Sequence, residues 1–181
     1  MKQYLGCLLL VACSRGKAAV DPNVTSVPVT KAAIELDGEW EEADWDTRAA
    51  REVFKTNGVE TRPFSEIRFL HDREHLFVTL YAADENVLSS DAFDLQIGRL
   101  AMRINPAGKS TPPTDSVRIA TDLDGSLDDE SNSDEEWVVE LAVPLASLGD
   151  LNQLTVHTAR CDTPHGSKPR CGAWDGAIAL E

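Results

Sequence analysis

From position 31 onward, short runs of alternating apolar and polar residues are separated by turn residues, about every 8 to 15 positions. Runs of this kind are typical of β-strands, and no segment carries an apolar helical stripe of useful length. The pattern predicts an all-β fold, an antiparallel β-sandwich of the immunoglobulin-like or jelly-roll type, with one short helical turn at 145–148. The predicted strands are 33–36, 51–55, 66–70, 76–82, 93–97, 100–104, 117–121, 137–143, 154–160 and 177–180.

The alternation also assigns faces to three of these strands, because successive side chains of a strand point to opposite sides of the sheet. Asp94, Arg103 and His157 are predicted to lie on the side that faces away from the core. The strand at 76–82 is apolar on both faces and is expected to be central and covered on both sides. The residues predicted to face the core are Phe93, Leu95, Ile97, Leu100, Met102, Ile104, Leu154, Val156 and Thr158.

The N-terminus has the features of an export signal. Lys2 precedes an apolar stretch, which predicts a signal peptide over residues 1–12. Leu-Val-Ala-Cys at 10–13 resembles the lipobox of bacterial lipoproteins, in which the chain is cut before the cysteine and its thiol takes a diacylglycerol. The resemblance implies lipidation of Cys13, and Ser14 after it favours the outer membrane of the cell envelope. An ordinary secretory signal is the alternative.

The residues after the signal are small and polar, and they include Pro22 and Pro28. This composition predicts a flexible, lipid-anchored linker over 13–31, followed by one domain over 32–181.

Four cysteines are present, and two of them fall in or next to the signal peptide. Cys161 and Cys171 remain, and in an exported chain they are expected to form one disulfide across a Pro/Gly-rich loop. A metal site made by these two cysteines and His165 is the alternative, although its spacing matches no standard zinc site.

The composition indicates a globular protein and disfavours some kinds of binding partner. Of 181 residues, 42% are hydrophobic and 27% charged, which is normal for a globular protein. The net charge of −14 disfavours nucleic acid, because an acidic surface repels phosphates. No apolar run reaches the roughly 20 residues of a membrane-spanning helix.

Three segments together resemble the family 9 carbohydrate-binding module and its wider DOMON-like relatives: AIELDGEWEEADW at 33–45, EIRFLHDREHLFVTLYAAD at 66–84 and EWVVELAVPLASL at 136–148. Their order along about 150 residues matches the family pattern. The resemblance implies a β-sandwich that binds sugar and often accompanies glycan-degrading enzymes. The matched residues are Asp37, Gly38, Trp40, Ala43, Trp45, Asp72, Leu76, Phe77, Asp84, Trp137, Glu140, Pro144 and Leu148.

The same resemblance implies a ligand site. Asp94 and Arg103 match the family's acid and arginine, His157 falls near a polar position that the family uses, and Trp174 matches a late tryptophan loosely and could supply a stacking wall. The segment 89–94 lacks the tryptophan that the family often has there. In the alternative interpretation, Asp94 and Arg103 form only a cross-strand ion pair, and His157 is a plain surface residue.

The other tryptophans are expected to pack rather than to bind. Trp40 and Trp45 follow the Asp-Gly turn and look like a staple that pins it to the sandwich. Trp137 begins an apolar strand.

The acidic run before Trp137 has the oxygen density of a calcium site but not the EF-hand register, so a solvated acidic loop is the expected state and no cofactor is predicted. The residues concerned are Asp122, Asp124, Asp128, Asp129 and Glu130.

Catalytic motifs such as G-x-S-x-G and H-E-x-x-H are absent, so the chain is not expected to be an enzyme. The sequence predicts a non-catalytic carbohydrate-binding lipoprotein, whose partners are a glycan, the membrane through its anchor and a glycan-processing enzyme. A structural or protein-interaction sandwich with a degenerate sugar site is the alternative. Haem binding through Met102 and His157 is a distant third, because these side chains are expected on opposite faces.

Overall fold

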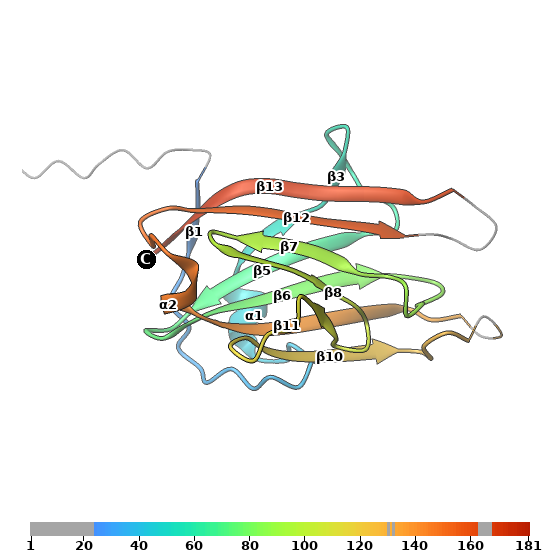
Figure 1. Ribbon diagram of the computed structural model, residues 1–181, viewed down its shortest axis with the longest axis horizontal. Helices are drawn as coiled ribbons and strands as arrows, with labels where there is room; N and C mark the ends of the chain where they lie inside the picture. Colours follow the sequence, from blue (N-terminus) through green and yellow to red (C-terminus); the bar gives the residue numbers. More distant parts are fainter. Residues whose placement is uncertain (1–23, 130, 132, 163–167) are drawn as a thin grey trace, which may run out of the picture.

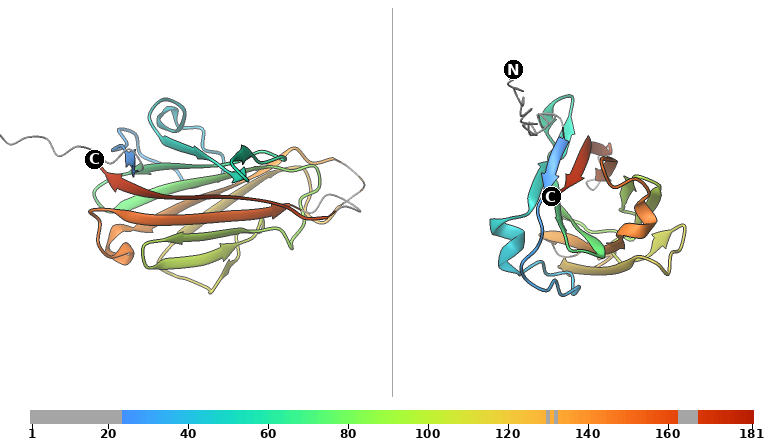
Figure 2. Two further views of the ribbon diagram at one scale, coloured as in Figure 1. Left: turned by 90° about the horizontal axis from the view of Figure 1, so that it is seen from above. Right: turned by 90° about the vertical axis from the view of Figure 1, so that its left-hand side faces the viewer.

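The computed structural model describes residues 24–129, 131, 133–162 and 168–181, and in this part of the chain two β-sheets face each other (Figures 1 and 2). Sheet A has eight strands in the order β4-β3-β13-β12-β7-β8-β9, with β1 paired to β13, and sheet B has five in the order β10-β11-β6-β5-β2. The sandwich prediction is therefore confirmed. Sheet A contains β1 (Val24–Val27), β3 (Lys55–Thr56), β4 (Val59–Glu60), β7 (Phe93–Ile97), β8 (Leu100–Ile104), β9 (Ser110–Thr111), β12 (Leu154–Asp162) and β13 (Arg170–Leu180). Sheet B contains β2 (Ala50–Val53), β5 (Ser65–His71), β6 (His75–Ala83), β10 (Arg118–Asp124) and β11 (Glu136–Pro144).

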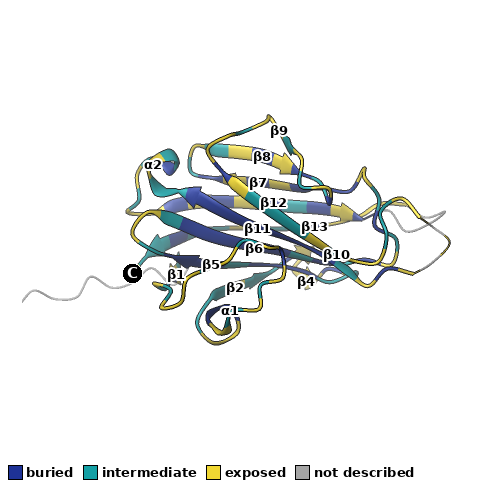
Figure 3. Cartoon of the chain, turned by 90° about the horizontal axis from the view of Figure 1, so that it is seen from below, coloured by how far each residue is buried: buried dark blue, intermediate teal, exposed yellow. Residues whose placement is uncertain are grey.

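The core fills the space between the two sheets, and the predicted faces are confirmed there. Phe93, Leu95 and Ile97 of β7 are at most 2% exposed. The Phe93 ring packs against Trp137 of β11 across the sandwich, with ring centroids 4.7 Å apart. In Figure 3 the sheet interiors are buried, whereas exposed positions recur along β7, β8 and β12. Burying these side chains drives the two sheets together.

The strands at 93–97 and 100–104 and the short helix α2 (Leu145–Leu148) lie where the sequence predicts them. The strand predicted at 33–36 is wrong, because this segment forms no ladder. Its apolar side chains, Ile34 and Leu36, pack instead on a second apolar cluster on the outer face of sheet B. The alternation of apolar and polar residues at 33–36 therefore arises because one side of the segment is buried on the sheet, although the segment pairs with no strand.

The predicted linker at 13–31 ends earlier than expected. Val24–Val27 form β1, which pairs in parallel with β13, and Val27 is fully buried. Backbone hydrogen bonds join Thr30 to His71 and His71 to Pro28. The packed part of the chain therefore includes at least residues from Val24 onward. The signal peptide and Cys13 lie outside the described residues.

The outer face of sheet B is covered by residues 34–49, which lead into β2 and are called the covering segment below. This segment contains the short helix α1 (Ala43–Thr47), which the sequence did not predict, and Trp45 within it is 1% exposed. Trp45 packs with Leu70, Phe77 and Ala142 on the outer side of the sheet. Central strand β6 is thereby covered on both faces, and the packing roles predicted for Trp45 and Trp137 are confirmed.

Glu140 fastens this covering segment to the sheet. Its side chain is fully buried, and Oε2 accepts hydrogen bonds from the backbone N–H groups of Asp37 (3.2 Å) and Gly38 (2.9 Å). Gly38 adopts φ +95°, and a Cβ built there would lie 2.5 Å from the backbone of Thr121 and Asp122 in β10. The Asp-Gly turn thus rests directly on the sheet, and only glycine fits it.

Arg160 of β12 links the two sheets through a buried polar network. Its guanidinium pairs with Asp84 at the end of β6 and donates to the Ser65 hydroxyl and the Ala83 carbonyl. Asp162 lies 3.6 Å from the same guanidinium. Burial raises the pKa of Asp162 to about 6, against the opposing effect of Arg160.

A disulfide joins Cys161 of β12 to Cys171 of β13, as the sequence predicts. The two residues are directly opposite each other in the antiparallel ladder. The alternative metal site is excluded, because both thiols are used in the disulfide. His165, its third candidate ligand, lies outside the described residues.

Replacement of Gly38 by alanine is expected to destabilise the protein by about 3 kcal/mol or more, since it adds a backbone collision to a left-handed φ. Gly58→Ala is the matched control: its φ is +81°, yet a Cβ there meets nothing within 4 Å. It should cost only about 1–2 kcal/mol. Urea denaturation of both variants tests this, and equal losses would contradict the tight contact at Gly38.

Glu140→Gln is expected to flatten the pH dependence of stability. Burial, assisted by Glu42 and Asp37, raises the pKa of Glu140 from 4.5 to about 7 in the folded chain, against the hydrogen bonds from Gly38 and Asp37. Because the folded pKa is the higher one, ionisation opposes folding. This penalty is absent below about pH 4.5 and complete above about pH 7.

Wild type should therefore lose unfolding free energy between pH 5 and pH 8, by an amount on the order of 2 kcal/mol that the Gln variant does not lose. Urea denaturation at both pH values measures this difference. Glu39→Gln, at an exposed position of the same segment, is the control. Parallel pH profiles for wild type and Glu140→Gln would contradict the assignment.

Candidate functional site

An open depression of about 310 Å³ lies on the outer face of sheet A, over β7, β8 and β12. This face carries the positions that alternate with the core residues of the same strands, so burial on one side forces these side chains outward. Asp94, Arg103 and His157, predicted as ligand-binding residues, all line the depression. Its other lining residues are Leu95, Gln96, Ala101, Met102, Thr111 and Pro112.

Asp94 and Arg103 are directly opposite each other on β7 and β8 and form an ion pair. Nη1 of Arg103 lies 3.0 Å from Oδ1 and 2.9 Å from Oδ2 of Asp94. Both side chains are about half exposed, so this pair contributes little to folding. Because a single nitrogen makes both contacts, Nε and Nη2 have no partner within the described residues. The pair presents a donor and an acceptor side by side.

His157 lies on β12, on the other side of β7 from Arg103. It pairs in the ladder with Gln96 on β7 and with Asp175 on β13. Its Nδ1 forms a hydrogen bond with Oδ1 of Asp175. Asp175 was not predicted as a site residue, because finding it requires the register between β12 and β13. Once that register is known, the pairing follows from the sequence.

The expectation that Trp174 forms a stacking wall beside these residues is not met by the geometry. Trp174 is paired with Thr158, which faces the core, and its ring packs against Phe69 of sheet B at 5.8 Å between centroids. Trp174 therefore contributes to the sandwich interior, on the opposite side of sheet A from the depression. Among the described residues that line the depression, none is Trp, Tyr or Phe.

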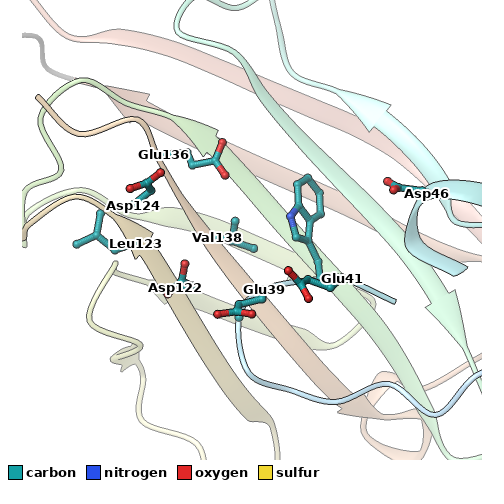
Figure 4. Close-up of a pocket in the computed structure, with 10 residues that line it drawn as sticks. Glu39, Glu41, Asp46, Asp122, Leu123, Asp124, Glu136 and Val138 are labelled. Carbon is teal, nitrogen blue, oxygen red and sulfur yellow. The ribbon is translucent and has the colours of Figure 1, made fainter. Parts of the chain in front are cut away.

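A larger depression, of about 540 Å³, lies on the outer face of sheet B beside the Asp-Gly turn. Figure 4 shows carboxylates around it from β10, β11 and the covering segment. Trp40 lines it too, but this ring is stacked on Tyr81 and has the Arg68 guanidinium 4.2 Å above it. Its polar side chains are almost all acceptors. The acidic residues are Glu39, Glu41, Asp46, Asp122, Asp124 and Glu136.

Two of the residues considered for calcium accept hydrogen bonds from backbone N–H groups of the protein. Asp128 accepts the Ser89 N–H, and Asp129 accepts the Ser131 N–H. Within the described part of the chain, no three His, Cys, Asp or Glu side chains are arranged to hold a metal ion. Glu130 lies outside that part. Met102 and His157 both line the depression, but the Met102 side chain belongs to the core cluster and is 5% exposed, whereas the His157 side chain is half exposed on the outer strand face. The two haem-ligand candidates therefore lie on opposite faces of sheet A, as the sequence predicts.

Three solved structures that share this fold are described as carbohydrate-binding modules or as a putative carbohydrate-binding protein. A family 9 carbohydrate-binding module from Caldicellulosiruptor kristjanssonii, solved with cellotriose, is 13% identical, with a TM-score of 0.63 over 87% of this chain and 94% of its own. A family 9 module from the same organism, solved with glucose, is 13% identical, with a TM-score of 0.61 over 87% of this chain and 96% of its own. A putative carbohydrate-binding protein from Bacteroides uniformis gives 0.59 at 13% identity, over 87% and 99%.

These similarities confirm, for the fold, the resemblance that the sequence motifs suggested. No protein-family model matches the chain, and no curated protein matches it. No helix in the described ranges has the length and apolar character needed to cross a membrane.

Proposed function

We propose that this protein is a non-catalytic carbohydrate-binding lipoprotein of the bacterial cell envelope, and that it holds a glycan on the outer face of sheet A. The observation that carries the proposal is the open depression in which Asp94, Arg103 and His157 meet, on a sandwich that shares its fold with family 9 carbohydrate-binding modules. Cellotriose and glucose are the sugars bound by the similar modules.

The polar groups of the depression suit hydroxyl-rich ligands. A sugar hydroxyl both donates and accepts, so it can bridge a carboxylate and a guanidinium that lie next to each other. Asp94 and Arg103 are joined by one guanidinium nitrogen, which leaves lone pairs and N–H groups for such a bridge. The two-stranded platform under them is rigid because its opposite face is packed into the core.

One observation favours a second candidate, a structural or protein-interaction sandwich with a degenerate sugar site. No Trp, Tyr or Phe side chain among the described lining residues offers a broad flat face for the C–H groups of a sugar. Hydrogen-bonding groups alone would then have to carry recognition.

Binding of glycans to the purified protein tests the main proposal. We expect binding on a glycan array that includes cellotriose, and a loss of affinity of about tenfold or more in Arg103→Ala and Asp94→Ala, because each removes one partner of the bridging hydroxyl. Both variants should unfold within about 1 kcal/mol of wild type, since the pair is exposed.

Asp122→Asn is the control, because it removes an exposed carboxylate from β10 of the other sheet and should bind as wild type does. A folded wild-type protein that binds no arrayed glycan would favour the second candidate. Equal losses in Asp94→Ala and Asp122→Asn, with no loss in Arg103→Ala, would place the effect in net charge rather than in the depression, because only the two Asp variants make the net charge less negative.

Anchoring at the envelope is the other part of the proposal, and Cys13 is its key residue. Cys13→Ser should release the protein from the membrane fraction to the soluble fraction, because stable attachment depends on the acyl chains. Cell fractionation with metabolic labelling by palmitate measures both location and lipid. Lipidation would be contradicted if Cys13→Ser remained in the membrane fraction and the wild-type protein took up no palmitate.

A further inference from the structure

The contact between His157 and Asp175 has a consequence for what the depression can recognise. Asp175 lies directly opposite His157 in the β12–β13 ladder and binds Nδ1 of its ring, but it does not itself line the depression. Both side chains are substantially exposed, at 50% for His157 and 72% for Asp175. The carboxylate therefore reaches the depression only through the imidazole.

The chemistry of the two groups fixes where the hydrogen lies. An ionised carboxylate only accepts, so the ring nitrogen that binds it must carry a hydrogen. A neutral imidazole has one N–H, and with Nδ1 protonated the other nitrogen, Nε2, is left with a free lone pair. Within the described residues Nε2 has no hydrogen-bond partner, so it is the nitrogen open to a ligand.

We propose that Asp175 is a positioning residue, which holds His157 in the Nδ1–H tautomer so that Nε2 accepts a hydrogen bond from a ligand hydroxyl. This inference rests on the proposed function and specifies the ligand further. The depression then offers two acceptors, Nε2 of His157 and the Asp94 carboxylate, together with the Arg103 donor.

Strand register sets the spacing of these two acceptors. Asp94 is paired with Ala159, so His157 is its diagonal neighbour across the ladder, at about 7–8 Å between Cα atoms. A sugar that donates O–H groups at two separate ring positions matches this arrangement. A ligand that presents only acceptors at the His157 end does not.

The test is Asp175→Ala, which removes the acceptor of the Nδ1–H group at an exposed position. An Asn there would not serve, because its amide oxygen can accept the same hydrogen. At pH 8.5, long-range ¹H–¹⁵N spectra of the imidazole should show mainly Nδ1–H for His157 in the wild-type protein and mainly Nε2–H in the variant. Asp122→Asn removes the same charge from the opposite sheet and should leave the His157 signals unchanged.

The second readout is the affinity for cellotriose against pH. Wild type should bind about 3- to 10-fold more tightly than Asp175→Ala at pH 8.5, and it should lose this advantage on acidification, because protonation converts Nε2 into a donor in both proteins. A purely structural role for Asp175 would not produce this convergence.

The outcomes separate the two proposals. An unchanged tautomer in Asp175→Ala would overturn the positioning role, and so would a changed tautomer with the same cellotriose affinity at every pH. Wild-type protein that shows the expected tautomers but no affinity for cellotriose would support the Asp175–His157 geometry and count against cellotriose as the ligand of the proposed function.

Discussion

The alternation of side chains across a packed β-sheet is the constraint on which the site depends. Phe93, Leu95 and Ile97 are buried between the two sheets, and the pleat of β7 then turns Asp94 and Gln96 to solvent. Reversing this orientation would move the apolar set out of the core, at a cost of several kcal/mol. The polar surface of sheet A is thus held in place by apolar contacts that the ligand never touches.

The two sheets use their outer faces differently. Sheet B is covered by the segment that carries the Asp-Gly turn and Trp45, and Glu140 binds that segment from below. A buried carboxylate with one oxygen left unpartnered is a destabilising feature of the folded state, which fits the raised pKa of Glu140. The covering segment leaves sheet A as the broad face on which strand-borne polar groups of both charges meet solvent.

Period-two patterning was sufficient to predict β7 and β8 and the outward positions of Asp94, Arg103 and His157, because each strand has one apolar face. It was not applied to Trp174, whose role as a wall came from the resemblance alone, because Gly172 and Gly176 interrupt the pattern and the predicted strand begins only at position 177. Counting back in steps of two from the buried Ile178 would have placed Trp174 on the core side.

Two other features needed more than local pattern. The 33–36 segment alternates like a strand because its apolar residues are buried on a sheet, and only the three-dimensional arrangement distinguishes covering from pairing. Asp175 could not be identified as the partner of His157 until the β12–β13 register was fixed. Sequence therefore predicted which residues face outward on one strand, but not which residues meet between strands.

The missing aromatic wall has a consequence for affinity. Without stacking, recognition rests on a few exposed hydrogen bonds, each with a net value of about 0.5–1.5 kcal/mol. Three such bonds amount to about 1.5–4.5 kcal/mol, so only the upper end of this range reaches the roughly 4 kcal/mol of a millimolar dissociation constant, even before the cost of immobilising the sugar. On the proposed function, weak single sites would serve a protein displayed in many copies on a membrane, where simultaneous attachment of one polymer to several copies raises the effective affinity without new contacts. On this proposal, anchoring many copies on one membrane compensates for the weak binding of each polar site.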